Sequence, residues 1–199
     1  MSKVEWSYAT PGIPDHLFRR VHGIPMTKQE IRLISICKLR IFPGATVYDI
    51  GAGTGSVTVE CALLAAPGTV YALEKDSIAD ELVETNVRRF GLNNVKLVPG
   101  YAPDTLDKLP PADRIFIGGS AGALAEILQA ADEKLKSGGW LVANAVTLET
   151  GPQVLKFLEE KGYQQVDAVS ISIARAKALG RSHLWEAQNP VQIISGQKS

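Results

Sequence analysis

Cysteine is scarce in this sequence: only Cys37 and Cys61 occur among 199 residues. They lie far apart in the chain and have no metal-ligand spacing, which excludes a zinc module and the disulfide framework of a small secreted protein. We therefore expect both to be buried thiols in a reducing compartment. This interpretation predicts a cytoplasmic location and no protein-bound metal.

Long hydrophobic runs are also missing. No stretch approaches the roughly 18 apolar residues of a membrane-spanning helix, and the N-terminus lacks the apolar core of a secretory signal. The 18 glycines and 11 prolines are too few for a collagen or a disordered chain. These absences argue against a membrane partner and predict one domain, residues 1–199, with a full hydrophobic core.

The sequence has no net charge, because 21 basic side chains balance 21 acidic ones. This balance argues against a general nucleic-acid binder. The charges are unevenly placed, however: residues 1–40 and 175–183 are basic, whereas residues 41–174 are acidic. The two basic flanks are either solvated surface or two parts of one binding region.

Short apolar segments alternate with amphipathic ones from residue 46 onward. We predict strands at 46–50, 69–73, 95–98, 114–117 and 140–146, and helices at 56–66, 77–91, 120–136 and 150–161. A further helix is expected at 28–39, and Thr27, Ser56 and Ser120 are the expected N-caps. Strands at 165–173 and 191–194 follow, separated by a polar connection. The pattern predicts an α/β fold: a Rossmann-like, doubly wound, mostly parallel sheet with a late antiparallel strand pair.

A glycine-rich loop stands between the first predicted strand and its helix. It carries Gly51, Gly53 and Gly55, with Asp49 two residues ahead. A dinucleotide fingerprint would have its third glycine at position 56, which is Ser56 here. The observed spacing fits S-adenosylmethionine better, because that cofactor brings no pyrophosphate to the helix N-terminus. Asp49 would hold the loop, contact the cofactor's ammonium group through water, or only cap the turn.

Two further strand ends fit the same cofactor. Glu74 ends the second strand, about where an acid binds the ribose hydroxyl groups in such folds. The third strand runs into a turn in which Ala102 is the candidate adenine contact, and Tyr101 would stack or merely pack. The fourth strand enters the glycine-rich segment 118–122, either a pocket floor or a helix entry. No residue has the context of a nucleophile or a general base, so no catalytic residue is assigned.

This combination of loop, acid and adenine turn resembles the class I S-adenosylmethionine-dependent methyltransferases. Three further segments are similar to the precorrin C-15 methyltransferases of cobalamin biosynthesis: GIPMTKQEIR at 23–32, IGGSAG at 117–122, and IARAKALGR at 173–181, with Asn189-Pro190 beyond. The match covers nearly all the chain from about residue 11. The sequence departs from the family in having Glu74 where Asp is frequent and Tyr101 where Asp is frequent.

The resemblance implies S-adenosylmethionine as cofactor and C-15 methylation of cobalt-precorrin-6B, with decarboxylation of the acetate on ring C. It also implies a homotetramer. The cofactor contacts that it implies, together with Asp49 from the loop argument, are Thr27, Asp49, Gly51, Ala52, Gly53, Thr54, Gly55, Glu74 and Ala102.

A substrate that carries many carboxylates needs cationic partners, and arginine suits bidentate carboxylate binding. We therefore expect Arg175, Lys177, Arg181 and His183 to line the substrate mouth beside the cofactor. Arg19, Arg20 or Lys28 would join them from the N-terminal arm, residues 1–40. The same flanks would alternatively serve subunit contacts.

Three other classes of function share parts of this pattern. An RNA or protein methyltransferase would have the same cofactor loop, although the acidic central region disfavours it. A nicotinamide-dependent oxidoreductase and a non-catalytic binding module also remain as alternatives at this point.

Overall fold

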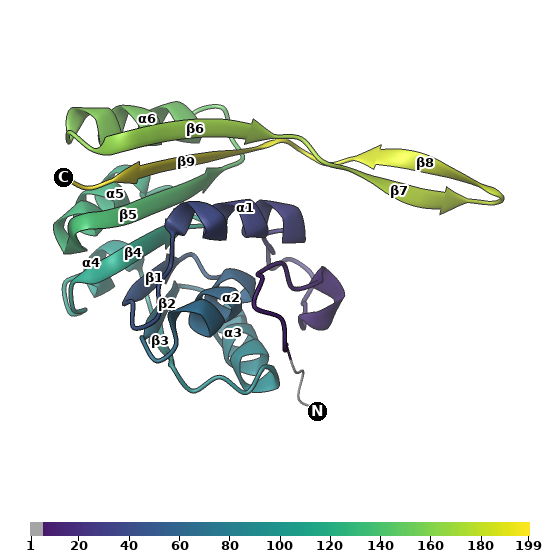
Figure 1. The fold of residues 1–199 in the computed structure, drawn as a ribbon, viewed down its shortest axis with the longest axis horizontal. Helices are drawn as coiled ribbons and strands as arrows, with labels where there is room; N and C mark the ends of the chain where they lie inside the picture. The colour runs from purple at the N-terminus through teal and green to yellow at the C-terminus, as the bar shows by residue number, and fades with distance from the viewer. Residues whose placement is uncertain (1–5) are drawn as a thin grey trace.

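The computed structural model describes residues 6–199. Seven strands form one sheet in the order β3-β2-β1-β4-β5-β9-β6 (Figure 1). The five strands from β3 to β5 are parallel, and β9 is antiparallel to both of its neighbours. The predicted fold class is thereby confirmed, including the late antiparallel pair. The strands are β1 Val47–Ile50, β2 Val70–Glu74, β3 Val95–Pro99, β4 Ala112–Ile117, β5 Leu135–Ala145, β6 Gln164–Ile171 and β9 Val191–Gln197.

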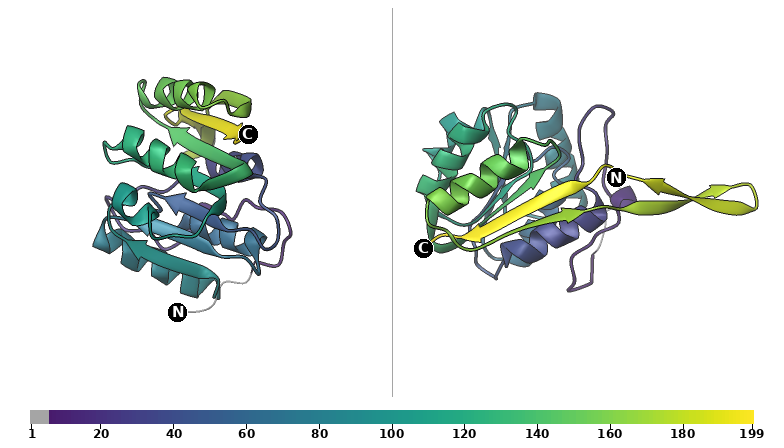
Figure 2. Two further views of the ribbon diagram at one scale, coloured as in Figure 1. Left: turned by 90° about the vertical axis from the view of Figure 1, so that its left-hand side faces the viewer. Right: turned by 90° about the horizontal axis from the view of Figure 1, so that it is seen from above.

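Helices cover both faces of the sheet (Figure 2). One face carries α1 (Gln29–Leu39), α2 (Ser56–Ala65) and α3 (Ser77–Arg89). The other carries α4 (Ala102–Leu106), α5 (Leu124–Lys134) and α6 (Thr150–Glu160), and a 3-10 turn at Asp15–Leu17 precedes α1. Among residues 6–199, no helix is both long enough and apolar enough to cross a bilayer.

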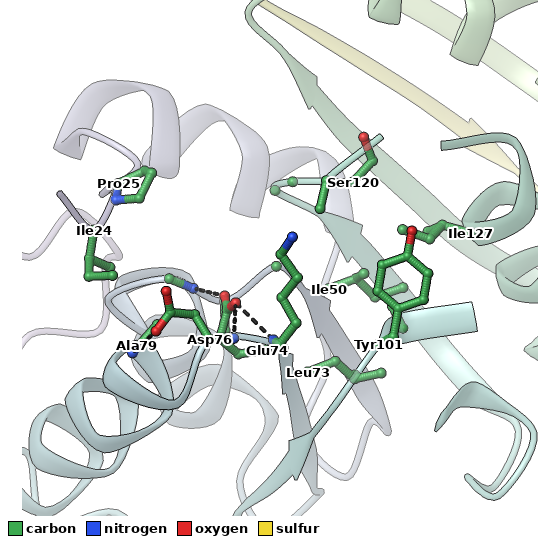
Figure 3. A pocket seen from close by; sticks show the side chains of 18 of the residues that line it. Ile24, Pro25, Ile50, Leu73, Glu74, Asp76, Ala79, Tyr101, Ser120 and Ile127 are labelled. Atoms are coloured by element: carbon green, nitrogen blue, oxygen red, sulfur yellow. Dashed lines mark hydrogen bonds between the residues drawn. The ribbon is translucent and has the colours of Figure 1, made fainter. Parts of the chain in front are cut away.

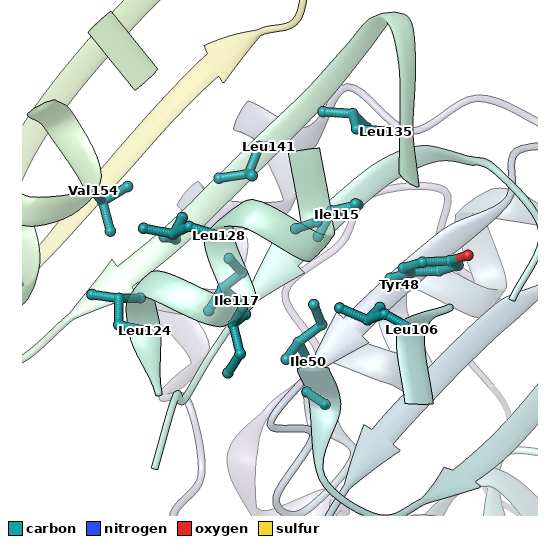
Figure 4. Close-up of a cluster of buried hydrophobic side chains, with 14 of the residues drawn as sticks. Tyr48, Ile50, Leu106, Ile115, Ile117, Leu124, Leu128, Leu135, Leu141 and Val154 are labelled. Atoms are coloured by element: carbon teal, nitrogen blue, oxygen red, sulfur yellow. The ribbon is translucent and has the colours of Figure 1, made fainter. Parts of the chain in front are cut away.

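The central strands are apolar on both faces, which explains their near-continuous hydrophobic sequence. In β4, Ile115 and Ile117 belong to the cluster under α4, α5 and α6, whereas Phe116 between them belongs to the cluster under α1 and α2. Figure 4 shows the first cluster, to which Leu128 of α5 and Leu141 of β5 both belong. Burial on both faces fixes the strand register and therefore the heights at which the strands end.

Several predicted helix ends are wrong. Lys28 rather than Thr27 caps α1, and α2 follows Gly55 in the left-handed conformation, so Ser56 is already helical. The helix predicted at 120–136 is α5, and it begins at Leu124 rather than Ser120. Ala121 and Gly122 have φ of 49° and 91° and therefore cannot belong to a right-handed helix.

Two further details concern α3 and β5. Asp76 caps α3 through the backbone N–H groups of Ile78 and Ala79, and Ile78 is 56% exposed. The helix predicted at 120–136 ends at Lys134, and residues 137–139 lie within β5.

The connection predicted between residues 173 and 191 is a β-hairpin, made of β7 (Ala174–Leu179) and β8 (Ser182–Ala187). Every residue of both strands is exposed, and the hairpin extends well away from the sheet (Figures 1 and 2). Gly180 turns the chain with φ of 58°, as a two-residue hairpin loop requires. The segment predicted as a polar connection is therefore a two-stranded hairpin that forms a sheet of its own.

Candidate active site

A pocket lies over the carboxyl ends of β1, β2 and β4, where open α/β sheets bind their ligands (Figure 3). Its walls come from five segments: residues 23–27, the loop at 50–53, residues 73–79, residues 100–102 and the loop at 118–121. Ile127 of α5 closes one side. Five chain segments that are distant in sequence therefore meet here because the parallel strands end at one edge.

Two of the loop glycines are required by close approach of other backbone segments. A Cβ atom on Gly51 would lie 2.7 Å from the carbonyl oxygen of Gly119, and one on Gly53 would lie 2.8 Å from that of Pro25. Both glycines also have positive φ, 75° and 55°. The loop is thus wedged between segment 118–121 and the chain that precedes α1.

Glu74 joins β2 to the glycine loop. One carboxylate oxygen accepts the N–H of Gly53 at 2.9 Å, and the other accepts the N–H groups of Lys75 and Asp76 at 2.8 and 3.1 Å (Figure 3). These three bonds hold the carboxylate at the pocket wall. An anionic acceptor is thereby presented to any ligand that bears hydroxyl groups.

Asp49 lies behind the loop and is completely buried. One of its oxygens accepts the hydroxyl of Thr58, and the other has no partner among the described residues. Burial raises the pKa of the Asp49 carboxyl to about 7; the negative charge of Glu74 adds to this rise, and the hydrogen bond from Thr58 opposes it.

The structure brings six of the nine predicted cofactor contacts to the pocket: Thr27, Gly51, Ala52, Gly53, Glu74 and Ala102. The other three lie outside its lining. Asp49 and Thr54 are buried, and Gly55 packs against Val83 of α3. Thr27 does not cap α1 but lies in the pocket wall, and its contact with a cofactor stays a prediction.

Sequence reasoning missed several wall residues. Ile24 and Pro25 come from the chain before α1, Lys75 and Asp76 follow Glu74, and Ile127 comes from α5. Nothing in these residue types marks them as part of a ligand site. Only Lys75 and Asp76 could have been suspected, because they directly follow Glu74, the predicted ribose acid.

The four predicted substrate residues lie on the hairpin and not in the pocket lining. Arg175 pairs with Glu30 of α1 at 2.5 Å, and Lys177 pairs with Glu186 across the hairpin at 2.7 Å. Arg181 forms part of the turn, and His183 is opposite Ala178. Within one chain these cations therefore do not line the mouth of the pocket.

Metal-binding groups are not found in the described part of the chain: no cluster of three or more His, Cys, Asp or Glu side chains could hold an ion. Cys61 is buried, as expected, but Cys37 is exposed, so that part of the cysteine prediction is wrong. Cys37 lies on the outward side of α1, where α1 needs no apolar contact.

The sheet order, with an antiparallel strand inserted between β5 and β6, and a glycine loop after β1 define a class I methyltransferase fold. Comparison with known proteins shows to which family within this class the chain belongs. A family model described as the precorrin methyltransferase domain matches residues 18–198, and the chain belongs to this family.

Individual proteins agree with that assignment. The probable cobalt-precorrin-6B C(15)-methyltransferase (decarboxylating) of Sulfurisphaera tokodaii is 46% identical over 190 residues, which cover 94% of this chain and 98% of that protein. The crystal structure of precorrin-6y C5,15-methyltransferase from Geobacter metallireducens matches with a TM-score of 0.88 and 41% identity, covering 96% of this chain and 98% of that one. The precorrin 8W decarboxylase of Methanobacterium thermoautotrophicum matches with a TM-score of 0.87 and 36% identity, covering 92% and 98%.

Proposed function

We propose that this protein uses S-adenosylmethionine to methylate C-15 of cobalt-precorrin-6B and removes the acetate carboxyl group on ring C. The observation that carries the proposal is the pocket at the strand ends, in a chain whose near full-length relatives bear that name. The family membership favours this acceptor over RNA, protein or a nicotinamide reaction.

The pocket residues fit the proposed cofactor. Gly51 and Gly53 form a cradle that a Cβ atom would fill, and the Glu74 carboxylate lies fixed where ribose hydroxyl groups would donate to it. Ala102, only 9% exposed at the start of α4, leaves room for an adenine ring on the other wall. Thr27 would complete the site from the chain before α1. When bound, the cofactor supplies a methyl group that is already electrophilic because its carbon is attached to a sulfonium.

The chain's own contribution is positioning and exclusion of water. Among residues 6–199, no histidine and no cysteine lines the pocket, and methyl transfer to an electron-rich ring carbon needs none. Holding the acceptor carbon in line with the methyl group lowers the barrier, because the entropy of bringing the two together is lost on binding and not in the reaction step. Loss of carbon dioxide leaves an electron pair that the conjugated macrocycle absorbs, so the substrate supplies its own electron sink.

The hairpin cations are proposed to bind substrate carboxylates, and a homotetramer is proposed as the assembly. The assembly is supported by the hairpin's exposure of Leu179, Leu184 and Trp185 at 59%, 56% and 77%, which favours contact with another copy of the chain. In such an assembly, Arg175, Lys177, Arg181 and His183 would reach the site of a neighbouring copy. We further propose a cytoplasmic location with no nucleic-acid or membrane partner.

The proposal is tested by incubating the protein with cobalt-precorrin-6B and S-adenosylmethionine labelled in its methyl group. Mass spectrometry of the macrocycle should show one labelled methyl gained and one carbon dioxide lost. Label that enters tRNA or protein instead, with the macrocycle unchanged, would refute the assigned acceptor. Retention of the carboxyl group after methylation would refute the decarboxylating half.

A further inference from the structure

One wall of the pocket is made by chain that belongs to no strand of the sheet. Residues 12–27, which we call the N-terminal strap, run from the outer side of α2 to the start of α1 and bring Ile24, Pro25 and Thr27 to the pocket (Figure 3). Apart from the 3-10 turn at Asp15–Leu17, the strap has no regular structure to hold its shape. Something else must fix its distance from the glycine loop.

We infer that Arg32, Glu60 and Asn86 are positioning residues for the cofactor: they hold the N-terminal strap against the glycine loop and so set the width of the pocket. The inference rests on the proposed use of S-adenosylmethionine. All three side chains are essentially buried, at 0%, 1% and 0% exposure, and none of them lines the pocket. Their polar atoms point at strap backbone.

Arg32 of α1 donates hydrogen bonds to both ends of the strap. Its guanidinium donates to the carbonyl oxygen of Thr27 at 2.6 Å, to that of Ile13, and to the carboxylate of Asp15 at 3.2 Å. Its Nε donates to Glu60 at 2.6 Å. Arg32 therefore contacts the pocket residue Thr27 directly while it is anchored to α2.

Glu60 fixes the beginning of the strap. Its two oxygens accept the N–H groups of Gly12 and Ile13 at 2.6 and 3.1 Å, and the charge is balanced by Arg32. A buried ion pair of this kind is weak evidence for a gain in stability, because well-packed apolar residues often serve the fold as well. Its directed bonds to strap backbone instead specify a position.

Asn86 of α3 links the strap to the glycine loop itself. Its side chain accepts the N–H of Arg19 at 2.7 Å, donates to the carbonyl oxygen of Arg19 at 3.0 Å, and donates to that of Thr54 at 2.8 Å. Between Arg19 and Thr27 the chain turns at Val21–Ile24 and then approaches Gly53 through Pro25. One amide thus joins the strap at Arg19 to the glycine loop at Thr54, close to the place where Pro25 and Gly53 form adjoining parts of the pocket wall.

The test compares two asparagines. Asn86→Ala removes the link between strap and loop, and Asn94→Ala is the matched control. Asn94 also donates to two backbone carbonyl oxygens, those of Ala62 and Gly68 at 2.9 and 3.0 Å. It directly precedes β3, however, and so lies at the amino end of that strand, away from the pocket at the carboxyl ends. Titration calorimetry with S-adenosylhomocysteine gives the dissociation constant of each variant, and thermal unfolding gives its stability.

We expect Asn86→Ala to raise the dissociation constant about tenfold, the effect of one lost or misplaced buried hydrogen bond. Both variants should lower the melting temperature, because each removes buried hydrogen bonds. Asn94→Ala should nevertheless leave the dissociation constant unchanged. In the methylation assay, Asn86→Ala should raise KM for the cofactor with kcat retained, because binding and not chemistry is affected. Arg32→Lys, which keeps the charge but loses the forked contacts, should behave in the same way.

A purely structural role would give equal dissociation constants for Asn86→Ala, Asn94→Ala and the wild type, and that result overturns the inference. Should Asn86→Ala fail to fold, the same comparison is decided by Arg32→Lys. A wild-type protein that does not bind S-adenosylhomocysteine overturns the proposed function and the positioning role together. Binding by the wild type with unaffected variants overturns only the positioning role.

Discussion

Asp49 places a carboxyl group in the interior directly behind the glycine loop. Folding raises its pKa to about 7, so the folded state favours the protonated form and binds more protons than the unfolded state between about pH 4 and pH 7. The stabilising contribution of this group is thus complete below its unfolded pKa and is lost as the pH rises through about 7.

This linkage predicts the behaviour of Asp49→Asn. From about pH 5 to about pH 8, the free energy of unfolding of the wild type should fall relative to that of the variant by roughly 3 kcal/mol. Asparagine retains an oxygen for the Thr58 hydroxyl but does not titrate. Urea unfolding of both proteins across that range checks the prediction, and parallel pH profiles would contradict it.

Glu74 carries the anionic part of the proposed cofactor site. Glu74→Gln keeps an acceptor oxygen but loses the charge, so S-adenosylhomocysteine should bind roughly 10- to 100-fold more weakly, as for other charge-assisted hydrogen bonds. Glu81→Gln, an exposed site on α3, is the control and should leave the affinity unchanged. Equal dissociation constants in calorimetry for the two variants would remove Glu74 from the site.

At the scale of single residues, the sequence predicted which loop and which strand end reach the pocket. Gly51, Gly53 and Glu74 do line it, because a tight turn favours glycine and the acid could be located by its spacing from the loop. Their contact with a cofactor stays a prediction. Thr54 was predicted as a contact by its position within the loop, but its side chain turns into the interior. Neighbouring loop residues point to different sides, and only the three-dimensional turn shows which side faces the ligand.

The β7–β8 hairpin is exposed along both of its strands. A two-stranded hairpin is marginally stable by itself in water, so the exposed side chains of Leu184 and Trp185 favour a partner surface. The double variant Leu184→Ser/Trp185→Ser should therefore dissociate a tetramer into smaller species, as measured by light scattering. Leu148→Ser, at an 85% exposed leucine in the β5–α6 loop, should leave the mass unchanged. A monomeric wild type would contradict the proposed assembly.

The hairpin also carries the proposed substrate cations. Arg181→Ala should raise KM for cobalt-precorrin-6B about tenfold while the dissociation constant for S-adenosylhomocysteine stays constant. Arg175→Ala should weaken substrate binding and also break the pair with Glu30, so a small loss of stability is expected with it. Unchanged substrate KM in both variants would leave the hairpin with assembly as its only proposed role.

Among the elements, the long apolar strands and amphipathic helices were predictable, and the hairpin was not. Residues 174–179 alternate alanine with charged residues or leucine, and a face made only of alanines is a weak strand signal because alanine has low strand propensity. The start of α5 was misplaced because serine is a favoured N-cap residue, which makes Ser120 the expected cap. Only the structure shows that Ala121 and Gly122 have a left-handed backbone conformation.

Across the whole molecule, function depends on where distant segments meet. The parallel register of β1, β2 and β4 brings three strand ends to one edge, and buried side chains of α1, α2 and α3 hold the N-terminal strap beside it through bonds to strap backbone. The sequence predicted the first of these from strand periodicity. It did not predict the second, because the strap's partners are single buried polar side chains at irregular spacing.

The central claim is that the pocket between the glycine loop and the N-terminal strap binds the methyl donor. The most direct measurement is a crystal structure of the protein with S-adenosylhomocysteine. We predict its ribose hydroxyl groups within hydrogen-bond distance of Glu74, its adenine beside Ala102, and its sulfur above Gly51 to Gly53. Ligand density at any other place, or a dinucleotide pyrophosphate seated on this loop instead, would contradict the account.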